Sequence, residues 1–183
     1  MAVVFLAMPG FAIPSDLCSC DPAVQTKSLR QRLESLRGWT HGVSLSFMPH
    51  KSFLTSRTET MLRLGGCTYD VTNDMTGLID ILLGAQISVG YPAGMDKYRP
   101  EARFGIYIGA DLGGGLDLWF SDPLVFDSHN RWVVGQSHDR GDVTAYRIMA
   151  APTLRDSLWD WARAHGYPRQ NTAAECQEML TGD

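Results

Sequence analysis

Two runs of sequence, Phe104-Gly-Ile-Tyr-Ile-Gly109 and Gly113-Gly-Gly-Leu-Asp-Leu118, decide the fold of this chain. In both runs apolar residues recur at every second position, a period that is typical of β-strands. The connection between them is short and rich in glycine, and strands joined by a short turn pair antiparallel. The two runs therefore predict an antiparallel hairpin whose glycines adopt positive φ angles in the turn.

The register of this hairpin follows if it is symmetric about Leu112. Trp119 then lies opposite Gly105, and Tyr107 lies opposite Asp117, all on the face that points away from the core. A tryptophan that covers a glycine stabilises a sheet locally. A tryptophan on an acidic surface is also a typical anchor for a protein partner. Both interpretations of Trp119 stay open at this point.

Further strands are expected on both sides of the hairpin. Downstream, the same alternation predicts strands at Leu124–Phe126, Arg131–Val134 and Val143–Met149. Upstream, Val43–Phe47 alternates apolar and polar residues, and Thr58–Leu64 is a weaker candidate. The short spacing of these runs predicts a sheet that is mainly antiparallel.

Helices are expected before and after the strands. Asp21 and Pro22 mark the start of a first helix that ends near Gly38. A second helix is expected to begin at Asn73 or Asp74, to include Val89 and to end at Gly90. The expected capping boxes are Thr153-Leu-Arg-Asp156, which opens a helix closed by Gly166 and Pro168, and Thr172-Ala-Ala-Glu175, which opens a short last helix.

Together these elements predict one α+β domain over residues 1–183, with helices packed on a mainly antiparallel sheet. Residues 1–20 form an N-terminal arm or strand in this interpretation, with Ala2–Leu6 buried. The side chains expected in the core are Phe104, Ile106, Leu116, Leu118, Phe120, Leu158 and Trp161.

Composition narrows the class of protein. The chain has 183 residues, a net charge of −4 and 44% hydrophobic residues. It contains no apolar run of membrane-spanning length, and its acidity disfavours direct binding of nucleic acid. The first basic residue is Lys27, so the basic region of a secretory signal is missing. We therefore expect a cytoplasmic protein without a membrane partner.

The four cysteines are Cys18, Cys20, Cys67 and Cys176. Cys18 and Cys20 are too close in sequence for an easy mutual disulfide, and no second cysteine or histidine pair completes a zinc pattern. All four are therefore expected to be reduced and free of metal.

The glycines at 109–115 do not form a phosphate-binding loop, because Gly115 stands where that motif requires lysine. His129 and His138, with Asp127, Asp139 and Asp142 nearby, resemble the ligands of a hydrolytic metal site without a fixed spacing. No nucleophile motif is present. The prediction is a protein that is not an enzyme and binds no metal or cofactor; a small metal-dependent hydrolase using the 127–142 turns is the alternative.

Charge is distributed unevenly along the chain. Residues 64–127 carry 9 acidic and 3 basic side chains, whereas residues 1–63 carry 4 acidic and 7 basic ones. The middle third is therefore the acidic part of the molecule.

The hairpin, together with Asp122-Pro-Leu-Val-Phe-Asp127 and a helix over Leu154–His165, resembles SUKH domains over about residues 100–165. Those domains share an aromatic–glycine strand, a glycine-rich turn and a strand that carries Leu-Asp. This sequence departs from their pattern in the proline-rich segment and helix that usually precede the sheet, and the resemblance does not extend to residues 1–60. Another bacterial family of toxin-immunity proteins fits about as well.

The resemblance implies a small intracellular bacterial immunity protein. Such a protein binds a cognate toxin, here a nuclease delivered by contact or by type VI secretion, and blocks its active site. An acidic inhibitor suits a nuclease, whose active site attracts phosphate. A secretion adaptor or chaperone is the third possibility. The expected partner-binding residues are Asp111, Asp117, Trp119, Asp122 and Asp127, with Asp139 and Asp142 next.

Overall fold

The computed structural model describes residues 21–39, 42–48, 66–71, 74–91, 95, 100–109, 115–122, 124–125, 131–139 and 144–168. The helices in these residues are α1 (Pro22–Ser35), α3 (Met75–Gly84) and α4 (Leu154–His165). The strands are β1 (Val43–Phe47), β2 (Cys67–Val71), β3 (Ser88–Val89), β4 (Phe104–Ile108), β5 (Leu116–Phe120), β6 (Leu124–Val125), β7 (Arg131–Asp139), β8 (Thr144–Ala150) and β9 (Gly166–Pro168).

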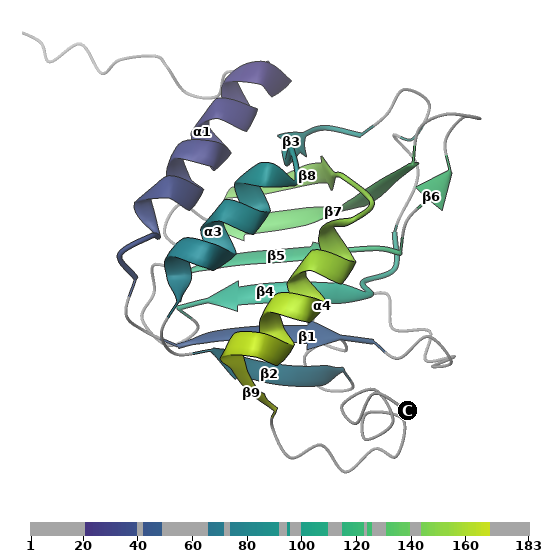
Figure 1. Ribbon diagram of the computed structural model, residues 1–183. Helices are drawn as coiled ribbons and strands as arrows, with labels where there is room; N and C mark the ends of the chain where they lie inside the picture. Colours follow the sequence, from purple (N-terminus) through teal and green to yellow (C-terminus); the bar gives the residue numbers. More distant parts are fainter. Residues whose placement is uncertain are drawn as a thin grey trace, which may run out of the picture.

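The strands form one sheet in the order β3-β8-β7-β5-β4-β1-β2-β9, and β6 pairs with β7. Every pairing between described strands is antiparallel. Figure 1 shows α1, α3 and α4 lying across the same face of this sheet. The predicted α+β class with a mainly antiparallel sheet is therefore confirmed.

The central hairpin has the register that its sequence predicts. Gly105 lies opposite Trp119, and Tyr107 lies opposite Asp117. Gly109, which follows β4, has a φ of 69°, in the left-handed region that favours glycine. Residues 110–114 of the turn lie outside the described residues.

The core lies between the helices and the sheet. It includes Leu29 and Leu33 of α1, and Leu78 and Leu82 of α3, which recur at helical spacing. The seven side chains expected in the core are all buried: Phe104, Ile106, Leu116, Leu118, Phe120, Leu158 and Trp161.

Two of the three predicted helix starts that the structure describes have the side-chain cap that the sequence indicates. The Asp21 carboxylate accepts a hydrogen bond from the Ala23 N–H at 2.8 Å, as a capping residue does. Asp74 caps α3 in the same way through the Gly77 N–H at 3.0 Å. Thr153, in contrast, makes no side-chain capping bond, so the predicted capping box at α4 is not formed.

Two predicted helix ends were wrong. The helix α1 ends at Ser35 rather than near Gly38, with Leu36 as its C-cap. The helix α3 ends at Gly84, because the chain then turns through Gln86, whose φ is +56°. Val89, which was expected on the helix, belongs to the edge strand β3 and pairs with Ile148 of β8.

Three features of the sheet were not expected. The strand β2 pairs with β1, although Thr58–Leu64 was the predicted strand in this region. That segment lies outside the described residues, as do residues 1–20 and the expected last helix at Thr172. The strand β9 continues directly from α4, where only a helix stop was expected, and β7 runs to Asp139 rather than to Val134.

Cys67 is fully buried and disulfide-bonded. The prediction that all four cysteines are reduced is therefore wrong for Cys67. The other three cysteines lie outside the described residues. In the part of the chain that the structure describes, no helix combines the length and apolar character needed to cross a membrane.

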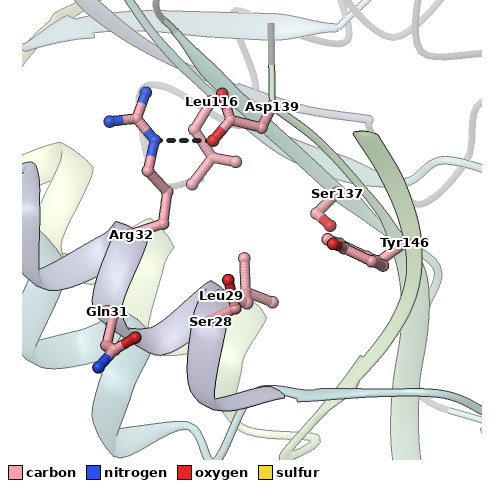
Figure 2. Close-up of a pocket in the computed structure, with 8 residues that line it drawn as sticks. All are labelled: Ser28, Leu29, Gln31, Arg32, Leu116, Ser137, Asp139 and Tyr146. Atoms are coloured by element: carbon pink, nitrogen blue, oxygen red, sulfur yellow. Dashed lines mark hydrogen bonds and ion pairs between the residues drawn. The ribbon is translucent and has the colours of Figure 1, made fainter. Parts of the chain in front are cut away.

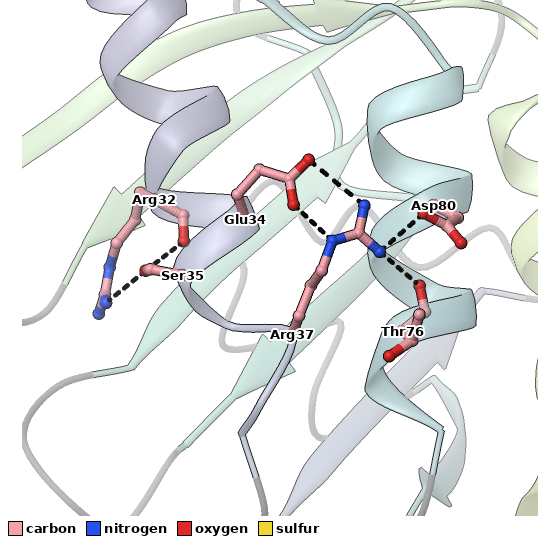
Figure 3. A network of polar contacts seen from close by, with 6 residues as sticks. All are labelled: Arg32, Glu34, Ser35, Arg37, Thr76 and Asp80. Atoms are coloured by element: carbon pink, nitrogen blue, oxygen red, sulfur yellow. Dashed lines mark hydrogen bonds and ion pairs between the residues drawn. The ribbon is translucent and has the colours of Figure 1, made fainter.

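The guanidinium of Arg37 joins α1 to α3, as Figure 3 shows. It donates two hydrogen bonds to the Glu34 carboxylate and makes an ion pair with Asp80 at 2.7 Å. It also donates to the Thr76 carbonyl oxygen at 3.4 Å. The bond to Arg37 is the main reason why the pKa of Glu34 lies below its ordinary value of 4.5.

Candidate functional site

Asp117 and Trp119 lie on the face of the sheet that points away from the three helices. They alternate along β5 with Leu116, Leu118 and Phe120, which belong to the core beneath the helices. Both are nevertheless buried: Asp117 is 2% exposed and Trp119 is 7% exposed. These two residues therefore do not form the exposed acidic surface that was expected. Alternation predicts which side chains share a face of the sheet, but it does not predict whether that face is exposed to solvent.

Asp122 follows β5 and is held between two arginines. Its carboxylate lies 3.5 Å from Arg103 Nε and 4.0 Å from Arg155 Nε, and its side chain is 42% exposed. Arg155 is only 11% exposed, and burial lowers the pKa of its guanidinium, which Asp122 partly opposes. Of the predicted contact residues, Asp122 thus presents a partly exposed carboxylate next to two arginines.

Asp139 lies at the other end of the same strand pair, because β7 places it opposite Leu116, the first residue of β5. Its carboxylate accepts a hydrogen bond from Arg32 Nε at 2.8 Å. Asp122 and Asp139 therefore lie far apart on the sheet and do not share one contact surface. The remaining predicted contact residues, Asp111, Asp127 and Asp142, lie outside the described residues.

The alternative metal site is weakened by the same alternation. His138 lies opposite Asp117 and faces away from the helices, while its neighbour Asp139 faces α1. Adjacent residues of a strand point to opposite faces, so these two cannot bind one ion together. His129 lies outside the described residues. Among the described residues, no three His, Cys, Asp or Glu side chains gather as metal ligands.

A cavity of about 300 Å³ lies between α1 and the strands β5, β7 and β8. Figure 2 shows the Arg32–Asp139 pair at one end of this space and Ser137 with Tyr146 at another, with Leu29 on the helix side. The complete lining is Ser28, Leu29, Gln31, Arg32, Leu116, Ser137, Asp139 and Tyr146.

The cavity contains an ion pair and an unpartnered hydroxyl. Arg32 and Asp139 are 30% and 15% exposed, so their contact is partly shielded from water. Ser137 is 1% exposed, and its Oγ has no hydrogen-bond partner among the residues that the structure describes. Buried polar atoms usually have partners, so this hydroxyl is the chemically unusual feature of the cavity.

Strand register and helix spacing bring these residues together. Ser137 lies opposite Leu118 of β5 on one side and opposite Tyr146 of β8 on the other. On α1, Arg32 lies three residues after Leu29, and therefore on the same side of the helix. The helix α1 therefore places Arg32 against the core-facing side of the sheet, next to the polar residues Ser137 and Asp139 of β7.

Sequence reasoning missed this cavity. A local signal did exist: along β7, alternation from the buried Val133 puts Ser137 and Asp139 on the core side, where apolar residues are expected. Arg32 comes from 107 residues earlier in the chain. No local pattern indicates that it would pair with Asp139.

Comparisons of the chain with protein-family models, with curated proteins and with solved structures found no match.

Proposed function

We propose that this protein is a binding protein that neutralises a cognate bacterial toxin, and that this toxin is a nuclease. The observation that carries the proposal is the order and register of the elements on which the resemblance to SUKH domains rests. The strands β4 and β5 pair so that Gly105 lies opposite Trp119, and α4 packs on the sheet after β8. This arrangement supports the resemblance, and toxin binding is what the resemblance implies.

Asp122 is the contact residue that we now place first. Its carboxylate lies at the rim where β5 ends, within ion-pair distance of Arg103 and Arg155, and is exposed enough to contact a partner. Glu101, 42% exposed, lies on the same rim and pairs with Arg103 at 3.7 Å. Arg103 and Arg155 balance the charges of Asp122 and Glu101, so the rim attracts a basic partner through the exposed parts of its carboxylates and not through a net negative charge. The basic groups of a nuclease active site can donate to these carboxylates, and loss of either carboxylate charge leaves a positive rim that such a partner approaches more slowly.

The hydrolase alternative is not favoured by the described residues, because Asp139 is paired with Arg32 and His138 points to the opposite face. The secretion-adaptor alternative makes a different prediction about partners. An adaptor should associate with the toxin without preventing its activity, whereas an immunity protein should prevent it.

The compartment is a separate part of the proposal. The cytoplasm is the compartment expected for a protein that neutralises a nuclease. The disulfide at Cys67 counts against it, because stable disulfides are typical of oxidising compartments. A protein that binds the toxin in an oxidising compartment, before the toxin enters the cytoplasm, can contain a stable disulfide and still protect the cell.

The test is co-expression with the toxin encoded beside this gene. We expect survival to depend on the intact protein and purified protein to inhibit the nuclease in vitro. Asp122→Asn and Glu101→Gln should lower the association rate, with the larger effect at low salt. Asp160→Asn, on an exposed position of α4, is the matched control. It should change neither the survival of the cells nor the association rate.

Folding must be verified for Asp122→Asn, because this change weakens the contact between Asp122 and the largely buried Arg155. Thermal unfolding of each variant gives this control. Absence of protection by the intact protein contradicts the proposal. Binding without inhibition favours the adaptor instead.

A further inference from the structure

We propose that the cavity between α1 and the strands β5, β7 and β8 binds a small neutral sugar of monosaccharide size. Its volume of about 300 Å³ is at the lower end of the range for small-molecule sites. The proposal does not depend on toxin binding, because Asp122 lies at the opposite end of β5 from the cavity.

The unpartnered hydroxyl of Ser137 is the first reason. It lines the cavity, it is 1% exposed, and no described residue accepts from it or donates to it. A hydroxyl shielded from water without a partner is unfavourable, so a ligand that supplies the missing hydrogen bond gains affinity. A sugar hydroxyl can do so as either donor or acceptor.

The charge balance of the cavity is the second reason. The guanidinium of Arg32 and the carboxylate of Asp139 contact each other at 2.8 Å, so their charges compensate. An ionic ligand would have to compete with this pair and to lose its own hydration. A neutral polyol avoids that cost, since its hydroxyls can accept from a guanidinium and donate to a carboxylate.

The apolar part of the lining is the third reason. Leu29 and Leu116 contribute aliphatic side chains, and Tyr146 contributes a ring with a hydroxyl at its edge. Figure 2 shows Leu29 facing the space between the polar residues. A pyranose ring has hydroxyls at its rim and carbon-bound hydrogens on its faces. Its surface therefore matches a cavity that is apolar on one side and polar at its ends.

The probes are glucose, galactose and mannose, tested against the full chain by saturation-transfer NMR and titration calorimetry. Acetate and methylammonium serve as ionic probes that are smaller than a hexose and can therefore enter the same space. We expect at least one hexose to bind with one-to-one stoichiometry and neither ion to bind. Failure of all three hexoses to bind, or binding of an ion in their place, would overturn the proposal.

Three variants locate the site. Ser137→Ala should weaken hexose binding about tenfold, the effect of one lost hydrogen bond in a buried site. Ser28→Trp, a change at an exposed cavity-lining position of α1, should abolish binding by filling the space.

Ser46→Ala is the matched control. It removes another buried serine hydroxyl, one that is bonded to Thr68 at 2.8 Å away from the cavity. It should leave hexose affinity unchanged. Unchanged affinity in both Ser137→Ala and Ser28→Trp would place the hexose elsewhere and would overturn the proposal. Near-ultraviolet circular dichroism confirms that each variant is folded.

Discussion

Trp119 lies directly opposite Gly105 across the β4–β5 pair, and it is only 7% exposed although it faces away from the three helices that the structure describes. Its buried neighbours there are Met48 and Ala102. A glycine opposite leaves room for a large ring on the sheet surface, which is the local stabilising arrangement expected for such a pair. The position is therefore structural first, whatever it contributes to binding.

Trp119→Ala is expected to lower the free energy of unfolding by about 3–5 kcal/mol, as large aromatic truncations in cores do. Urea unfolding followed by circular dichroism measures the change. Val24→Ala is the comparison, because Val24 is 49% exposed and its truncation should change stability by less than about 0.5 kcal/mol. If Trp119→Ala is as stable as the wild type, the indole is not buried, and the contact interpretation regains support.

Gly135 and Gly84 provide a second prediction, since the same substitution should have opposite effects. A Cβ at Gly135 would lie 1.7 Å from the carbonyl oxygen of Trp119, a backbone atom that cannot move without opening the β5–β7 pair. Gly135→Ala should therefore unfold the protein or destabilise it severely. Gly84, the last residue of α3, has no atom within 4 Å of an added Cβ.

Gly84→Ala should stabilise the protein by up to about 1 kcal/mol, because alanine restricts the unfolded chain. Thermal and urea unfolding of the two variants side by side tests the pair. Tolerance of alanine at position 135 would show that β7 does not approach β5 as closely as described.

The register of the hairpin could be predicted because period-two patterning and a short turn are local features. The pairing of β9 with β2 could not, since Gly166 and Pro168 look like ordinary helix-stop residues. The accessibility of the second sheet face was also out of reach. The pattern places Tyr107, Asp117 and Trp119 together, but burial depends on contacts between segments that are distant in sequence.

The cavity shows the same limit. Ser137 and Asp139 were visible as polar residues on the core side of a strand, but only once β7 was known to extend to Asp139. Their partner Arg32 belongs to a helix whose placement on the sheet has no local signal. A site assembled from α1 and β7 is therefore a tertiary property.

The contact between Arg37 and Glu34 predicts a pH dependence of stability. The pKa of Glu34 is lowered in the folded protein, chiefly by its hydrogen bonds with Arg37. The stabilisation is therefore present above the ordinary value of 4.5 and is lost as pH falls through the lower, folded-state pKa. Wild type and Glu34→Gln should differ in midpoint of unfolding at pH 7 and converge in acid.

The effect should be small and should shrink in high salt, because both side chains are partly exposed to water. Urea midpoints at a series of pH values, with and without added salt, measure it. Glu101→Gln is the control, because it removes a different carboxylate and should leave the pH dependence due to Glu34 in place. A difference between wild type and Glu34→Gln that persists in acid would show that the charge of Glu34 is not its source.

The disulfide at Cys67 gives the prediction that bears most directly on where the protein acts. Protein unfolded without reductant and alkylated should contain fewer than four modified cysteines, and four after reduction. Reduction should also lower the free energy of unfolding, by about 2–4 kcal/mol if this disulfide is typical. The Cys67 sulfur is fully buried, so reduction of the folded protein should be slow. Mass spectrometry of protein taken from its host and alkylated at once is the decisive measurement. Four modified cysteines without prior reduction would show that Cys67 is a reduced thiol and would support action in the cytoplasm. A native disulfide would instead favour an oxidising compartment.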